Sequence, residues 1–463
     1  MRLSHLLGPE LKQALREDPE QVRALLDEIH PEDLSDLVSE LEPEDAAELM
    51  SRLPAETAAP IFERMEEHEQ EELVSLMPPE SVAHIASEME ADDRADLFNL
   101  LDEDRGDEIF RRLERVDPEA ALEVREIEKW PETSAGHLVT TRYVQVPPEA
   151  TLGDAITAVR ELLEEDDDPI YFIYLVSEGD HLVGAVSIRS LVRYDDRSMP
   201  LSKLTIANLM SVPPDVDQEE VARQMSKYDL SEMPVIDATG KMLGIITVDD
   251  IIDVLTQEQS EDVQKLGAVE PLDVPYFHTS IVDFVKKRGF WLIVLFFGEF
   301  FTQTALRHYD PVFAMLQGAT YYVPLLISAG GNSGSQSSTL IIRGLAVGDI
   351  KPRDWYRVLG RELLMGILLG GILGVIGFLR VLMLDRDQGV GFALTIGLTL
   401  VGIVVTGCTV GSLLPIALKR VGLDPATSST PFIASLVDVL GIIIFVQSAR
   451  FVLGTLFGQP GLP

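Results

Sequence analysis

The sequence predicts a multidomain membrane protein with an all-α helical-repeat part, an α/β part made of two similar modules, and an all-α membrane part of five helices. Three observations lead to this prediction. Charge is unevenly divided along the 463 residues, a motif near 12 residues long recurs in the first quarter, and apolar segments fill the last part. We therefore expect four segments, with bounds at 1–133, 134–256 (modules at about 134–200 and 205–256), 257–285 and 286–463.

The charge distribution separates an acidic half from an apolar one. Residues 1–133 contain 13 Lys and Arg against 39 Asp and Glu, residues 134–285 contain 10 against 28, and residues 286–463 contain 14 against 9. Nucleic-acid binding is not expected, because phosphate contacts need clustered Lys and Arg, whereas an acidic surface suits cations. The single cysteine, Cys408, excludes a disulfide framework and a Cys-rich metal site.

The repeat runs from about residue 10 to residue 130. Its units begin with Pro or an acidic residue and end on Leu or Met, as in PEDLSDLVSEL (31–41) and PEDAAELMSRL (43–53). Pro fits the first turn of a helix, and acidic side chains there complement the helix dipole. Helices this short are unstable alone, so we expect them to stack into a solenoid. The simplest interpretation of most of these carboxylates is that they form helix-start charges and a solvated helix surface.

Residues 134–256 contain a helix–strand–strand–helix plan twice. The first copy includes YFIYLVS (171–177) and HLVGAVS (181–187), and the second is clearest in PVIDATGKMLGIITVDDI (234–251). The plan resembles a tandem pair of CBS domains, cytosolic modules that often sense adenine nucleotides. The resemblance implies that Thr247 and Asp250 contact ribose and phosphate. An Asp-Asp pair is a poor phosphate partner without a cation, so ATP is only an alternative cofactor.

The connector, residues 257–285, begins as an acidic helix and is then interrupted by Pro271 and Pro275. After it, FWLIVLFFGEFFTQTALRHY has the ~20 residues that a bilayer core requires. Counting this segment, five spanning helices are predicted, at 290–309 and at about 312–342, 358–384, 390–418 and 431–457.

The orientation in the cell (inner) membrane is predicted from the basic residues. Ten Lys and Arg lie before the first span, between the second and third, and after the fourth; the other side has four, Arg307, Arg380, Arg386 and Arg450. The positive-inside rule therefore places the N-terminus in the cytoplasm and the C-terminus outside. The opening segment MRLSHLLGPELKQ lacks the apolar core of a signal peptide, which agrees with a cytoplasmic start.

Polar residues inside the apolar part carry the strongest functional signal, because each must be satisfied within the protein. They gather in PLLISAGGNSGSQSSTLIIRGLAVG (324–348) and GLDPATSSTPFIASLVDVLG (422–441), where Asp438 interrupts an apolar helix. We expect Asp438 to face water or a cation; the alternative is a hydrogen-bonded Asp that joins two helices. For Glu299 in the first span, both a functional role and a simple inward contact with a Ser or Asn stay open.

The motifs GGNSGSQSSTLIIRGLA, LLPIALKRVGLDPA and TPFIASLVD resemble the MgtE family of magnesium channels and transporters, and so does the order of segments. The resemblance implies a homodimer in the lipid bilayer with a Mg²⁺ pore on its two-fold axis, between the second and fifth spans. The matching pore residues are Asp438, Asn332, Gly331, Ala434 and Thr430. Thr430 stands where many relatives have Asn, which is a departure in the pore region.

The resemblance also implies regulatory Mg²⁺ that holds the acidic repeats, the second CBS domain and the connector (or plug) helix in a closed state. The matching residues are Asp92, Asp93, Asp96, Asp229, Asp250, Asp253, Glu258, Glu261, Asp262 and Asp424. Clustered carboxylates repel one another without a cation and are held together by one.

An enzyme is not expected, because no HExxH, GxSxG or GxxxxGK[ST] motif is present. A single acid per subunit with backbone oxygens suits hydrated Mg²⁺, whereas a Zn²⁺ or Cu²⁺ pathway would show His, Cys or Met. Three alternatives differ in class: a broader divalent cation transporter for Co²⁺ or Mn²⁺, a CBS-regulated secondary transporter of another solute, and a membrane-anchored enzyme or receptor. An anchor needs one span, and an organic solute would need a roomy cavity with aromatic or Arg groups.

Overall fold

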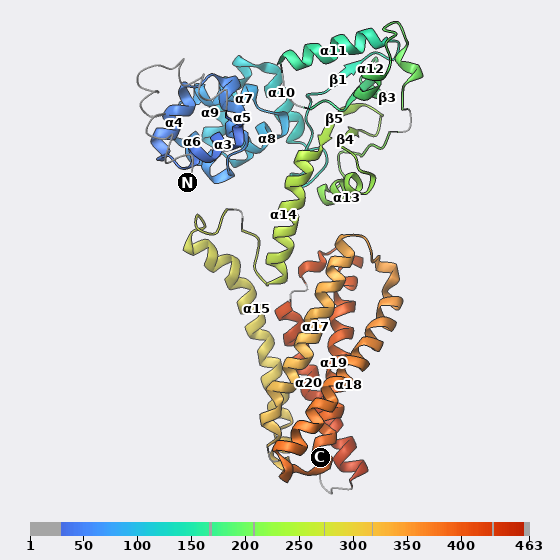
Figure 1. Cartoon of the computed structure of the whole chain (residues 1–463). Helices are drawn as coiled ribbons and strands as arrows, with labels where there is room; N and C mark the ends of the chain where they lie inside the picture. Colours follow the sequence, from blue (N-terminus) through green and yellow to red (C-terminus); the bar gives the residue numbers. More distant parts are fainter. Residues whose placement is uncertain are drawn as a thin grey trace. The chain divides into compact units, whose positions relative to one another are not determined.

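The computed structural model describes residues 29–165, 169–206, 209–272, 274–316, 318–427 and 430–457. The chain forms two compact units, Met1–Thr256 and Gln257–Pro463 (Figure 1). The opening segment MRLSHLLGPELKQ and the first part of the predicted repeat lie outside the described residues.

The first part of unit 1 is built from short helices, seven of which begin 12 residues apart, as the repeat predicts. Most begin at Pro or Ala and carry acidic residues in the first turn, which favours helix formation there. Each helix packs against the next but one in the chain, so the apolar faces enclose one continuous core. The helices are α3 (Pro31–Ser39), α4 (Pro43–Arg52), α5 (Ala55–Glu63), α6 (Glu67–Leu76), α7 (Pro79–Glu88), α8 (Ala91–Leu100), α9 (Glu103–Val116) and, after a longer step, α10 (Pro118–Ile127).

The second part of unit 1 contains two similar sheets, which agrees with the predicted pair of modules. In the first, β2 pairs in parallel with β1 and antiparallel with β3, with Tyr174 opposite Ala185; in the second, β4 and β5 are antiparallel, with Val235 opposite Gly244. A parallel bridge from Val212 to Val235 takes the place that β1 has in the first module. The elements are β1 (Val144–Val146), α11 (Leu152–Glu165), β2 (Phe172–Ser177), β3 (His181–Ser187), α12 (Ile188–Arg193), α13 (Gln218–Tyr228), β4 (Glu232–Ile236) and β5 (Met242–Thr247).

Helix α14 (Val248–Leu266) joins the last helix of the second module to the acidic connector without a break. The sequence suggested a boundary at residues 256 and 257, but TQEQSE contains neither Gly nor Pro, so nothing there stops the helix. The helix ends at Leu266, followed by Ala268 in a left-handed conformation with φ 57°. The prolines at 271 and 275 then separate it from the next helix.

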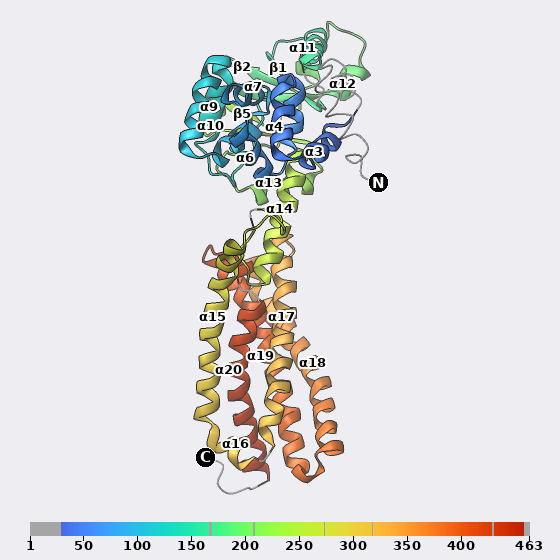
Figure 2. The same cartoon turned by 90° about the vertical axis from the view of Figure 1, so that its left-hand side faces the viewer.

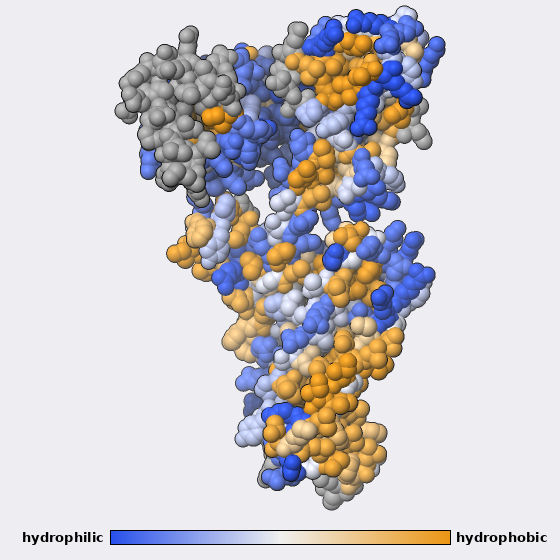
Figure 3. All heavy atoms as spheres, in the orientation of Figure 1, coloured by the Kyte–Doolittle hydropathy of each residue, from blue (hydrophilic) through white to orange (hydrophobic). Residues whose placement is uncertain are grey.

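Unit 2 contains five helices of 20 residues or more among the described residues: α15 (Ile281–His308), α17 (Val323–Ala346), α18 (Trp355–Leu384), α19 (Gly389–Arg420) and α20 (Thr430–Ala449). A π-helical segment, Arg450–Leu456, continues α20. Helix α19 packs against α17, α18 and α20, whereas α15 packs on α20 at the edge of the bundle (Figure 2). Apolar side chains cover much of the outer surface near α18 (Figure 3).

Four segments of unit 2 are long and apolar enough to cross a membrane: Ile281–His308, Pro352–Leu384, Arg386–Arg420 and Thr430–Leu456, among the described residues. The predicted apolar stretch at 312–342 is wrong in its bounds. A short helix, α16 (Asp310–Met315), comes first, Gly318 turns the chain at φ 84°, and α17 begins only at Val323. The first span, in contrast, starts nine residues earlier than predicted, at Ile281.

Helix α17 is held against α19 by glycines on both helices. A Cβ on Gly407 would lie 2.5 Å from the carbonyl oxygen of Gly330, and one on Gly411 would overlap the carbonyl oxygen of Gly334. Only residues without a side chain let two backbones approach this closely. The polar helix therefore gains dispersion contacts along its length, although its composition is less apolar than that of its neighbours.

Gly411→Ala is expected to destabilise the membrane unit by about 1–3 kcal/mol, the usual effect of overpacking. The variant should show a lower melting temperature in detergent than the wild type. Gly371→Ala is the matched control, because a Cβ at Gly371 would meet nothing within 4 Å. Equal melting temperatures for the two variants would contradict the close α17–α19 contact.

Candidate functional site

A cluster of carboxylates in unit 1 brings together two helix starts. Asp92 and Asp93 lie in the first turn of α8, and Asp250 lies in the first turn of α14. Thr247, the last residue of β5, donates its hydroxyl to Asp250 Oδ2 at 2.5 Å. Glu63 joins from α5 by accepting the backbone N–H of Glu90 at 2.7 Å. We call Glu63, Glu90, Asp92, Asp93 and Asp250 the acid cluster.

Burial and mutual repulsion act together on this cluster. Burial, followed by the charges of Asp250, Asp93 and Glu90, raises the pKa of Asp92 well above its usual value. The pKa of Asp93 is also raised, by burial and then by Glu63, Glu90 and Asp250, and burial raises the pKa of Asp250 to about 6. Asp92 is 7% exposed, and its Oδ1 has no hydrogen-bond partner among the described residues. Ionisation of the three aspartates is therefore opposed by burial and by the neighbouring carboxylates.

The buried cation of α8 is bound by groups outside the acid cluster. Arg94 donates to the carbonyl oxygens of Ala86, Met89 and Ala120 and pairs with Glu123 at 2.7 Å. It ties α7, α8 and α10 together, and all of its described contacts are to these groups. No local sequence pattern marks this role of Arg94, because its partners lie up to 29 residues away.

The other predicted regulatory residues of unit 1 are not part of the acid cluster. Asp96 contacts His137 Nε2 at 2.6 Å, and although burial lowers the pKa of His137, this contact outweighs burial and raises it. Asp229 ends α13 in a left-handed conformation with φ 52°. Asp253 lies on α14, the helix that also carries Asp250. Burial, followed by the charge of Asp249, raises the pKa of Asp253.

The connector acids in unit 2 gather around one lysine. Lys265 Nζ lies 2.7 Å from Asp424 Oδ2 and forms a second ion pair with Glu261. Burial lowers the pKa of Lys265, but these hydrogen bonds outweigh burial and raise it to about 12. Burial, followed by the charge of Asp424, raises the pKa of Asp262, with Glu258 and Glu261 adding to it. The structure thus brings Asp424, just before α20, to the connector helix.

Among the described residues no three His, Cys, Asp or Glu side chains converge closely enough to hold a metal ion directly. Mg²⁺ gives up its waters reluctantly and is often bound through them. Carboxylates spaced around a hydrated ion are compatible with that chemistry.

The predicted pore residues lie on the facing surfaces of α17 and α20. A Cβ on Gly331 would lie 3.3 Å from the Cβ of Ala434, and Ser335 Oγ donates to the carbonyl oxygen of Thr430 at 3.5 Å. Asn332 is exposed beside this contact and donates weakly to Ser328 at 3.4 Å, while Asp438 is half-buried on α20. The structure brings Gly331, Ala434 and Thr430 together, whereas no hydrogen bond joins Asn332 to Asp438 in the described part of the unit.

Helix α15 adds a second carboxylate beside Asp438. Ser435 Oγ donates to Glu299 Oε1 at 3.3 Å, so Glu299 is turned toward α20. The negative charges of Glu299 and Asp438 are close enough to repel each other.

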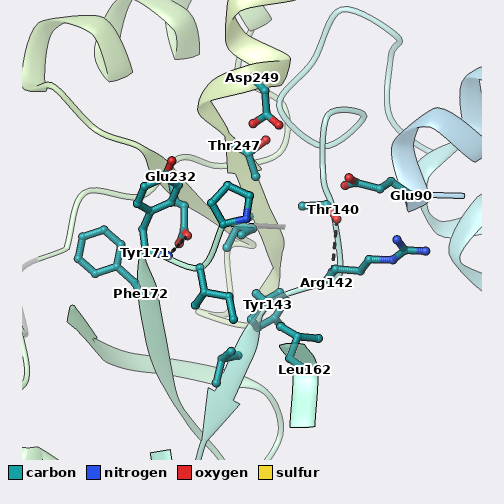
Figure 4. A pocket seen from close by; sticks show the side chains of 14 residues that line it. Glu90, Thr140, Arg142, Tyr143, Leu162, Tyr171, Phe172, Glu232, Thr247 and Asp249 are labelled. Carbon is teal, nitrogen blue, oxygen red and sulfur yellow. Dashed lines mark hydrogen bonds between the residues drawn. The ribbon is translucent and has the colours of Figure 1, made fainter. Parts of the chain in front are cut away.

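A pocket lies between the two modules of unit 1 (Figure 4). Thr247 lines it, together with Asp249, whereas Asp250 does not and belongs to the acid cluster. Glu232 is buried in the wall, where it accepts the hydroxyl of Tyr174 at 2.8 Å and the N–H of Tyr171 at 2.9 Å. Arg142 is the one cation among the lining residues. The walls are partly aromatic, and three acidic residues, Glu90, Glu232 and Asp249, line the pocket beside Arg142.

Comparisons with known proteins match each part of the chain. A family model described as a divalent cation transporter, MgtE, matches residues 323–448, an MgtE intracellular N domain matches 29–133, and CBS domains match 135–197 and 201–257. The magnesium transporter MgtE of Thermus thermophilus is 38% identical over 338 residues, which cover 73% of this chain and 74% of that protein. The protein of that name from Enterococcus faecalis is 30% identical, covering 72% of each.

A solved structure is also similar. The crystal structure of the soluble part of a magnesium transporter has a TM-score of 0.51 and 28% sequence identity, and the match covers 55% of this chain and 99% of that one.

Proposed function

The chain belongs to the MgtE family of magnesium transporters, which are membrane proteins and not enzymes, and from that premise we propose how its own residues carry and sense the ion. Mg²⁺ passes along the α17–α20 surface, with Asp438 as the acidic group and Asn332, Gly331, Ala434 and Thr430 beside it. The observation that carries this proposal is a carboxylate on an apolar helix that faces a helix of Gly, Ser and Asn. Such a face suits hydrated ions better than lipid.

The acid cluster and the connector acids are proposed to sense intracellular Mg²⁺. Three aspartates of the acid cluster, Asp92, Asp93 and Asp250, have raised pKa values, and Oδ1 of Asp92 has no hydrogen-bond partner among the described residues, so a cation would relieve the repulsion. At the connector, Mg²⁺ would compete with Lys265 for Asp424 and Glu261. Glu258 and Asp262 would be its further ligands. Asp96, Asp229 and Asp253 complete the proposed regulatory set. Bound Mg²⁺ closes the pore, and its loss opens it.

The remaining proposals concern organisation. We propose that the chain works as four segments, 1–133, 134–256, 257–285 and 286–463, and that the cytoplasmic N-terminus and external C-terminus follow from the basic residues. The pocket lined by Thr247 is the proposed place for ATP, held against its aromatic walls and Arg142.

Ion competition in proteoliposomes tests the transported species. We expect saturable Mg²⁺ uptake that an equal concentration of Ca²⁺ or an uncharged organic solute does not reduce. Strong reduction by Co²⁺ or Mn²⁺ would favour the second candidate, a broader divalent cation transporter, which the matched family description also allows. Uptake of a solute in place of Mg²⁺ would contradict the proposal.

The shared pore requires a homodimer, because one copy provides only one α17–α20 face. We expect light scattering in mild detergent to give twice the mass of the 51.1 kDa chain. A monomer that remains active after reconstitution at one copy per vesicle would contradict the shared pore.

A further inference from the structure

Two glutamates lie within the membrane-spanning helices, and each accepts a hydrogen bond from a serine. Glu299 on α15 accepts Ser435 Oγ at 3.3 Å, and Glu362 on α18 accepts Ser337 Oγ at 2.6 Å. Neither glutamate forms an ion pair within the described residues of unit 2. Placing a carboxylate inside a membrane costs free energy, which contacts with other groups must offset.

The surroundings of the two glutamates differ. Ser435 and Asp438 are three residues apart on α20 and therefore share one face of that helix. Glu299, which accepts the Ser435 hydroxyl, is thus held on the side of α20 that carries Asp438. A Cβ on Gly298 would lie 3.6 Å from the Cβ of Ser435, an ordinary van der Waals distance, so α15 and α20 are neighbours at this level. Glu362 instead contacts the α17 residue Ser337, which lies on a buried face.

We propose that Glu299 is a second carboxylate of the ion path, which acts with Asp438 to favour a hydrated dication over monovalent cations. Ser435 holds the Glu299 side chain toward α20. The inference rests on the proposed path along α20. Each added negative charge attracts a dication twice as strongly as a monovalent ion, so a pair of carboxylates selects for charge without having to strip water from Mg²⁺.

The paired serine–glutamate contacts provide a matched experiment on full-length protein in proteoliposomes. Glu299→Gln keeps the shape and removes the charge, and we expect it to raise the half-saturating Mg²⁺ concentration by about tenfold or more. The Mg²⁺ to K⁺ permeability ratio, from reversal potentials, should fall as well. Glu299→Asp should recover part of both. Glu362→Gln is the control and should leave half-saturation within about twofold, because its charge lies away from α20.

The outcomes separate this inference from the function on which it rests. Wild-type half-saturation and selectivity in Glu299→Gln would overturn the role of Glu299, whereas full flux in Asp438→Ala would overturn the path itself. A purely structural role would lower the amount of folded dimer and the maximal flux but would leave the permeability ratio unchanged. If Glu299→Gln does not fold, Ser435→Ala is decisive: it should shift half-saturation in the same direction, by about two- to threefold, and no shift would overturn the proposal.

Discussion

Asp438→Ala is expected to reduce Mg²⁺ flux to the background of empty liposomes while the protein still forms a folded dimer. Asp438 is the only acidic residue of α20, and in a dimer the pair supplies two negative charges to the path. Rings of acidic side chains are a common means of selecting cations in pores. Removing them leaves the dication without the carboxylate pair of α20, which raises the barrier by several kcal/mol. The measurement is dye-reported Mg²⁺ uptake at matched protein density.

Two variants make the result specific. Asp438→Asn preserves the side-chain shape and removes the charge, so it should lose flux almost as completely as Asp438→Ala. Asp349→Ala removes an exposed acid after α17 and should transport normally. Normal uptake through Asp438→Asn would place the ion on another route.

Asp92→Asn is expected to stabilise the cytosolic part without Mg²⁺ and to remove most of its response to Mg²⁺. The folded pKa of Asp92 is raised by burial and by three neighbouring acids, so ionisation of this group opposes folding. Relief of about 1–2 kcal/mol should raise the melting temperature of fragment 1–285 by about 2–8 °C in EDTA. Mg²⁺ at 100 times its Kd should add about 2.7 kcal/mol of stability to the wild type, and much less to the variant.

The raised pKa values also determine how the stability of fragment 1–285 depends on pH. A carboxyl whose folded pKa exceeds its unfolded value contributes stability below the unfolded pKa, near 3.9, and loses it as pH rises through the folded pKa. For Asp250 this window runs from about 4 to about 6. Without Mg²⁺ the wild-type fragment should therefore lose stability across that range, and Asp92→Asn should lose less. Glu44→Gln, on the exposed start of α4, is the control and should behave as the wild type. A flat wild-type profile in EDTA would contradict the repulsion.

The sequence predicted those features that depend on local pattern. The 12-residue repeat predicted the helices because each unit carries its own start signals and apolar face, and the two modules followed from their repeated strands. It did not predict the start of α17 correctly, because the polar residues of that helix are satisfied within the helix and by residues of α18 and α20, which lie far along the chain. The sequence therefore predicted a spanning helix in this region but placed its start too early, at about residue 312 instead of Val323.

The contacts that give the site its electrostatics are also long-range. Lys265 meets Asp424 across 159 residues, and Arg94 is bound by carbonyl groups of two other helices, so neither pairing leaves a local pattern. The candidate carboxylates could be named from the sequence, but which of them share one electrostatic field could be learned only from the fold.

The central claim is that Mg²⁺ on the cytosolic side closes a path that includes Asp438. The most direct measurement is ion flux through the reconstituted protein in a planar bilayer, with Mg²⁺ titrated on the side of the acidic half and held constant on the other. The account predicts that flux falls over the Mg²⁺ range that stabilises fragment 1–285, and that replacing Glu258, Glu261 and Asp262 with alanine leaves the path open at high Mg²⁺. Flux that does not change with cytosolic Mg²⁺, or that K⁺ at equal ionic strength reduces equally, would contradict it.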